Sequence, residues 1–143
     1  MFYMNLLRDQ RCHPRVPVGT LCTELYGNLE RQSLVLDVSD TGLRLQRPVA
    51  HTHGNNRIVQ LEFDVPGVDE IIWAKGLVCF DQFWSLPAGP AAPERSRLVH
   101  LSGVQILAAA QRHLRLLRDF VMDSWMRGVE PIRPGRLFAP AIL

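Results

Sequence analysis

The sequence predicts a mainly β protein, a single domain of six antiparallel strands followed by one amphipathic helix. Three observations support this prediction. Apolar and polar residues alternate with a period of two through most of the first 107 positions, and turn residues separate the alternating segments. The period changes to that of a helix after this point. The length of 143 residues suits one domain with a core of its own.

Turn residues define the ends of the predicted strands. Gly27-Asn28 joins the first two strands in a hairpin, and Pro66-Gly67 precedes the fifth strand. The fifth strand is long, so we expect it to be bent or bulged near Gly76. The proline-rich residues 86–97 are expected to be irregular. The predicted strands are residues 16–26, 29–38, 43–46, 57–65, 70–83 and 98–107.

A helix is predicted over residues 108–127, because apolar residues recur there every three or four positions. We expect this stripe to cover one end of the β structure and Gly128 to end the helix. The aromatic residues Trp73, Phe80 and Trp125 have the spacing of core residues. The stripe consists of Leu107, Ala110, Leu114, Leu117, Val121 and Trp125.

Composition limits the class of function. A net charge of +2 with 21% charged residues is too balanced for a polyelectrolyte binder, so an anion must be recognised by locally placed charges. The spacing of the three cysteines supports neither a disulfide framework nor a zinc site and suits a reducing cytoplasm; they are Cys12, Cys22 and Cys79. The N-terminus lacks the features of a signal peptide, and no apolar run is long enough to cross a membrane.

Two short motifs indicate a pocket for an anionic ligand that carries guanine. Arg11 and Arg15 lie four residues apart before the first strand, and Asp37, Ser39 and Gly42 form Asp-x-Ser-x-x-Gly at a strand end. A guanidinium binds phosphate or the O6 and N7 atoms of guanine, and a carboxylate accepts from guanine N1–H and N2–H₂. Serine reaches the ligand or holds the turn, and glycine suits a positive φ and close ligand approach. Further candidates for contact with the ligand are Arg8 and Arg44.

On these residues and the later strands the chain resembles the PilZ domain family, bacterial receptors for cyclic di-GMP. The resemblance covers most of the chain and implies a small six-stranded antiparallel β-barrel whose open end is capped by the C-terminal helix. It divides the chain into a ligand-binding leader (1–15), the barrel with its helix (16–128) and an irregular tail (129–143). Arg11, Arg15, Asp37, Ser39 and Gly42 are then ligand-binding residues. Many members of the family have an arginine directly before the paired arginines, where this chain has Gln10. This difference favours one bound ligand molecule over a stacked pair.

The function predicted from this resemblance is that of a cytoplasmic cyclic di-GMP effector that changes its surface and regulates a partner protein. Motility, pili, exopolysaccharide or biofilm formation is the expected output. The alternative is a PilZ-fold interaction module with weak or no nucleotide binding. We expect no enzyme activity, cofactor or metal, no nucleic acid polymer as partner and no membrane insertion. The sequence leaves open whether the chain forms a homodimer.

Overall fold

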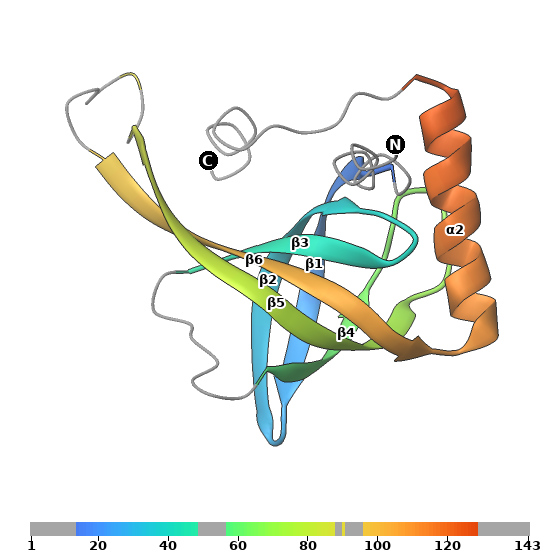
Figure 1. Ribbon diagram of the computed structural model, residues 1–143, viewed down its shortest axis with the longest axis horizontal. Coiled ribbons are helices and arrows are strands. Elements are labelled where there is room, and N and C mark those ends of the chain that lie inside the picture. Colours follow the sequence, from blue (N-terminus) through green and yellow to red (C-terminus); the bar gives the residue numbers. More distant parts are fainter. Residues whose placement is uncertain (1–13, 49–56, 88–89, 91–95, 129–143) are drawn as a thin grey trace, which may run out of the picture.

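The computed structural model describes residues 14–48, 57–87, 90 and 96–128, which form a closed barrel and one helix (Figure 1). The six strands are antiparallel, in the order β1-β2-β3-β6-β5-β4 around the barrel. This confirms the predicted fold class. The elements are β1 (Val16–Tyr26), β2 (Leu29–Val38), β3 (Gly42–Arg47), β4 (Ile58–Phe63), β5 (Ile72–Pro87), β6 (Ser96–Ala109) and α2 (Gln111–Met126).

The β5–β6 hairpin is longer than the sequence predicted. Pairing continues to Pro87 opposite Ser96, so the ends of residues 86–97 belong to strands although they were expected to be irregular. Cross-strand pairing overrides the local preference of a proline-rich segment at the end of a hairpin. The predicted irregularity near Gly76 is confirmed, because the register of β5 against β6 shifts between Lys75 and Gly76.

The barrel interior holds the main hydrophobic core, formed by inward-facing residues of every strand. The three aromatic residues predicted for this core lie elsewhere: Trp73 is 52%, Phe80 38% and Trp125 43% exposed. The prediction was wrong because aliphatic side chains fill a barrel of this size. The largest of them are Leu43, Leu45, Leu61 and Ile72, together with Phe63.

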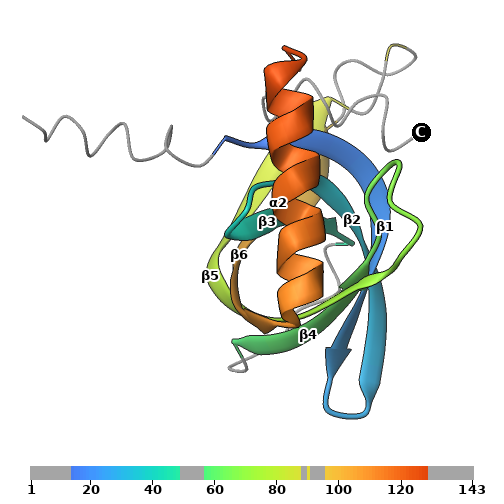
Figure 2. The ribbon, with the colours of Figure 1, turned by 90° about the vertical axis from the view of Figure 1, so that its right-hand side faces the viewer.

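Helix α2 lies across one open end of the barrel (Figure 2). Leu117 and Val121 are buried against the core, which confirms the predicted cap, whereas Leu114 of the same stripe stays partly exposed. The helix begins three residues later than predicted, because β6 continues to Ala109. No helix within the described residues is long and apolar enough to span a membrane.

Both cysteines that the structure describes are free thiols. Cys22 is buried in the core, and this burial raises the pKa of its thiol to about 12. Since the thiolate is the reactive form, Cys22 is an inert core residue. Cys79 is exposed and lies at the cavity described next, and Cys12 is outside the described residues.

Candidate functional site

The Asp-x-Ser-x-x-Gly motif forms the tight connection between β2 and β3. The Ser39 hydroxyl oxygen accepts hydrogen bonds from the backbone N–H groups of Thr41 (3.2 Å) and Gly42 (3.1 Å). The Ser39 backbone N–H donates to the Gly42 carbonyl oxygen at 2.8 Å. Ser39 is buried, so of its two predicted roles the geometry supports holding the turn.

Gly42 is required for the close approach of β3 to β6. A Cβ atom at this position would overlap the backbone carbonyl oxygen of Val104. The positive φ expected for Gly42 is not observed, since the described residues with positive φ are Gly19, Gly27, Gly67 and Gly128. The motif glycine therefore fixes how the turn is seated on the neighbouring strand.

Substituting Gly42→Ala is expected to lower the free energy of unfolding by about 2 kcal/mol, because an inserted methyl group must push two paired backbones apart. Urea denaturation measures the change. Gly103→Ala is the matched control, since its Cβ would meet the movable ring of Phe80 instead of backbone, and a smaller loss is expected. A Gly42→Ala protein as stable as the wild type would contradict this account.

Asp37 brings two arginines together beside this turn. Its carboxylate is fully buried at a bulge of β2 between Val35 and Asp37. Arg44 of β3 lies directly opposite and donates through Nε (2.9 Å) and Nη2 (2.5 Å) to Oδ2. Arg15, just before β1, donates through Nη1 to Oδ1 at 3.3 Å. Both carboxylate oxygens are thus engaged, and the two guanidinium groups are held at one point on the outer face of the barrel.

A cavity of about 300 Å³ opens next to these arginines. It extends from the turn to the facing parts of β5 and β6, where Phe80 rests against Gly103. Gly103 has no side chain, so the Phe80 ring lies directly on the strand and provides an apolar wall. The lining residues are Arg15, Ser39, Thr41, Gly42, Leu43, Cys79, Phe80, Gly103, Val104 and Gln105.

The structure brings together five of the residues named from the sequence: Arg15, Asp37, Ser39, Gly42 and Arg44. Arg8, Gln10 and Arg11 lie outside the described residues. Phe80 and Gly103 were missed as site residues. Only the pairing of β5 with β6 brings these two residues together, and a single sequence does not reveal that pairing.

A second charged cluster lies inside the barrel. Arg47 donates through Nε and Nη2 to the buried carboxylate of Glu24 at 2.8 and 2.7 Å. Its Nη1 also donates to the Ser102 hydroxyl and lies 3.5 Å from Asp81. His100 is 2.8 Å from the same Asp81 carboxylate oxygen. Glu24, Arg47, His100 and Ser102 are buried, and the members of the cluster satisfy one another, so we assign this cluster to stability.

The fold and the site together define a class of protein: a closed six-stranded antiparallel barrel that displays paired arginines at the turn between its second and third strands. The sequence matches the PilZ domain over residues 9–123, and the chain belongs to the PilZ domain family. The resemblance inferred from the motifs is confirmed. No curated protein sequence matches this chain.

Solved structures with this fold agree with the assignment. The PilZ domain with c-di-GMP of YcgR from Escherichia coli has a TM-score of 0.62 at 11% identity, covering 80% of this chain and 91% of that one. The Bacillus subtilis inhibitor of motility MotI/DgrA has a TM-score of 0.62 at 10% identity, with 82% and 52% coverage. MrkH of K. pneumonia in its apo state has a TM-score of 0.66 at 16% identity, with 84% and 50% coverage. The chain therefore spans about half the length of MotI and MrkH.

Proposed function

We propose that this protein is a receptor for cyclic di-GMP. The observation that carries the proposal is the convergence of Arg15 and Arg44 on the buried carboxylate of Asp37, beside an open cavity and within the residues that match the family. Two guanidinium groups suit the phosphates and guanine edges of a cyclic dinucleotide. The structural neighbours from E. coli and K. pneumonia include structures with c-di-GMP, which supports the same ligand here.

We propose that, on ligand binding, the Asp37 carboxylate exchanges its hydrogen bond with Arg15 for one with guanine. Arg15 is 45% exposed and makes the longer contact with the carboxylate, whereas Arg44 is held by two shorter ones. A phosphate that draws Arg15 away frees Oδ1 to accept from guanine N1–H. Asp37 thereby selects guanine, and the two hydrogen bonds from Arg44 keep its carboxylate oriented. Arg11 contributes a second guanidinium from the leader, with Arg8 and Gln10 as its neighbours.

The proposed output is regulation of a partner protein in the cytoplasm, with motility, pili, exopolysaccharide or biofilm formation as the process controlled. Movement of Arg15 changes the surface presented where the leader joins β1, and a partner that reads this surface responds to the ligand. Gln10 favours one ligand molecule per chain. The protein is proposed to act by binding and not as an enzyme.

A second candidate is an interaction module of the same fold with weak or no nucleotide binding. Two observations favour it: Gln10 stands where many family members have an arginine, and Asp37 already pairs with both described arginines of the site, so a ligand must compete with it. This module would act through its exposed apolar residues, among them Met122 and Trp125 of α2.

Calorimetric titration of cyclic di-GMP separates the two candidates. The wild type is expected to bind with micromolar or tighter affinity, and Arg15→Ala roughly 10- to 100-fold more weakly, because a charge-assisted hydrogen bond to phosphate is lost. Arg31→Ala is the matched control, since Arg31 lies six residues from Asp37 on β2, about 20 Å away. Cyclic di-AMP is the control ligand. No binding of cyclic di-GMP to the wild type would favour the interaction module.

A further inference from the structure

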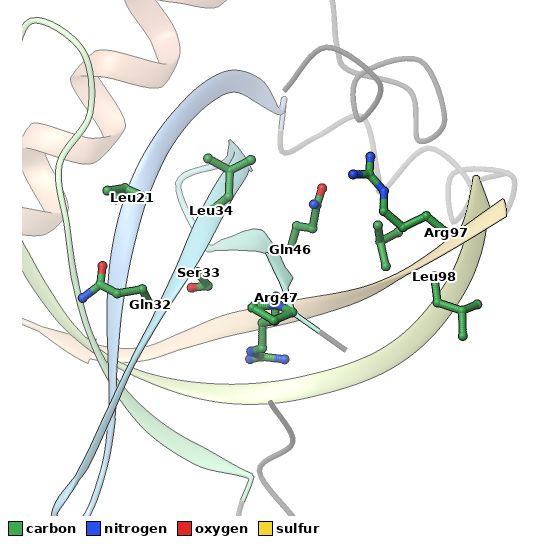
Figure 3. Close-up of a pocket in the computed structure, with 10 residues that line it drawn as sticks. Leu21, Gln32, Ser33, Leu34, Gln46, Arg47, Arg97 and Leu98 are labelled. Atoms are coloured by element: carbon green, nitrogen blue, oxygen red, sulfur yellow. The ribbon is translucent and has the colours of Figure 1, made fainter. Parts of the chain in front are cut away.

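The barrel has a second cavity of about 400 Å³ on its outer side, which the proposed site does not use (Figure 3). It lies over β3, between the β1–β2 hairpin and the end of β6. Its walls are mostly apolar, with Leu21, Leu34 and Leu98 among them, and Gln46 and Arg97 add polar groups. An apolar hollow with few polar groups is the usual form of a small-ligand pocket.

Three residues that line this cavity each carry a buried polar atom without a hydrogen-bond partner in the described part of the chain: Ser33 Oγ, Gln46 Oε1 and Arg97 Nε. The Gln46 Oε1 atom and the Arg97 Nε atom make no hydrogen bond to any part of the chain that the structure describes. Gln46 belongs to β3 and Arg97 to the neighbouring strand β6, and Figure 3 shows both among the side chains that line the cavity. A buried acceptor and a buried donor left unpaired each cost about 1–3 kcal/mol, so native proteins rarely keep them without a ligand or water.

Both cavities lie on one face of the same strands. Side chains two residues apart on a strand share a face, so Gln46 of the second cavity is on the face of Arg44 and Gly42. On β6 the same rule places Arg97 with Gly103 and Gln105, which line the first cavity.

The charged cluster of Asp37 and Arg44 lies between the two cavities. Along β3 the order is Gly42 of the first cavity, then Arg44, then Gln46 of the second. On β2 and the turn that follows it, the order is Ser39, Asp37 and then Leu34. Cyclic di-GMP has the same arrangement, with a central ring of two phosphates and a guanine on either side.

We propose, on the basis of the proposed function, that the second cavity holds the second guanine of one extended cyclic di-GMP molecule. Guanine presents an acceptor, O6, directly beside a donor, N1–H. Arg97 Nε donates to O6, and Gln46 Oε1 accepts from N1–H, so one base edge satisfies two of the three unpaired atoms. The leucine side chains cover the faces of the base. A peptide is a poorer occupant, because a trans peptide group directs its N–H and C=O to opposite sides and cannot easily bind Arg97 Nε and Gln46 Oε1 together.

The test is titration of cyclic di-GMP into Gln46→Leu and Arg97→Leu. Each variant is expected to bind about tenfold more weakly than the wild type, the effect of one buried hydrogen bond. Gln60→Leu on β4 and Arg112→Leu on α2 are matched controls at exposed positions and are expected to bind like the wild type. Circular dichroism melting curves check that every variant is folded.

A second readout places the base directly. Nuclear Overhauser contacts between the methyl groups of Leu34 or Leu98 and guanine H8 are expected in the complex, with one ligand per chain. Unchanged affinity in both variants, absence of these contacts or two ligands per chain would overturn the inference. If Arg15→Ala still weakens binding in that case, the receptor function stands and only the second subsite fails. A wild type that does not bind overturns both.

Discussion

Replacing Glu24 with glutamine is expected to lower the free energy of unfolding by about 3 kcal/mol at pH 7. The substitution keeps the shape of the side chain but removes the charge that neutralises Arg47, whose side chain is only 2% exposed. Asp81 remains 3.5 Å from Arg47 and still compensates part of its charge. The expected loss of stability is therefore at the lower end of the range for a broken buried ion pair. Equilibrium denaturation in urea measures the change.

The pH dependence of stability gives an independent measure of the same pair. Burial by itself would raise the pKa of Glu24, but hydrogen bonds and charge from Arg47 outweigh it and hold the pKa below its ordinary value of 4.5. A lowered pKa in the folded state contributes stability above pH 4.5, and this stability is lost as the pH falls through the folded-state pKa. The wild type should therefore lose stability more steeply than Glu24→Gln on acidification below pH 4.5.

Two further proteins control this prediction. Glu30→Gln makes the same change at an exposed position of β2 and should alter stability by less than about 0.5 kcal/mol. The double substitution Glu24→Leu/Arg47→Met removes both charges, so it should be more stable than Glu24→Gln if the unpaired charge is the cause. A double variant that is less stable than the single one would show that packing of these side chains matters more than their charges.

Local features of the sequence were sufficient to predict the six strands, apart from the extended ends of β5 and β6, and the turn of the candidate site. The connection from Asp37 to Gly42 depends on hydrogen bonds between residues two and three apart, and turn chemistry alone predicts it. Arg44 is placed opposite Asp37 by the same short connection, seven residues further along the chain. Arg15 was predicted through the family motif, although the partner that holds it is 22 residues away.

Features that depend on long-range register could not be predicted in this way. Alternation along β5 places Phe80 on the inner face with Val78, but the register shifts between these two residues and turns Phe80 outward into the cavity. The pairing of Arg47 with Glu24 and Ser102 joins residues 23 and 55 positions apart. Nothing local in the sequence specifies these partners, because only the closed order of strands brings them together.

Replacing Asp37 with asparagine is expected to weaken cyclic di-GMP binding about 100-fold, which corresponds to about 2.7 kcal/mol. Asparagine has nearly the same shape but offers only one acceptor atom, so it cannot hold Arg15 and Arg44 at separate oxygens as the carboxylate does. The arginines then lose their fixed geometry, and binding must order them at its own cost. Calorimetric titration measures the affinity of the variant and of the wild type.

Asp40→Asn is the matched control, because it makes the same charge change three residues away in the same turn, at a residue outside the cavity lining. Its affinity should stay within about threefold of the wild type, so a general change in net charge is separated from the loss of the Asp37 carboxylate. Tighter binding by Asp37→Asn would contradict the proposal, since it would mean that the carboxylate only competes with phosphate for the arginines. Weaker binding with guanine selectivity retained would assign Asp37 to arginine placement alone, whereas loss of discrimination against cyclic di-AMP would show that its freed oxygen contacts the base.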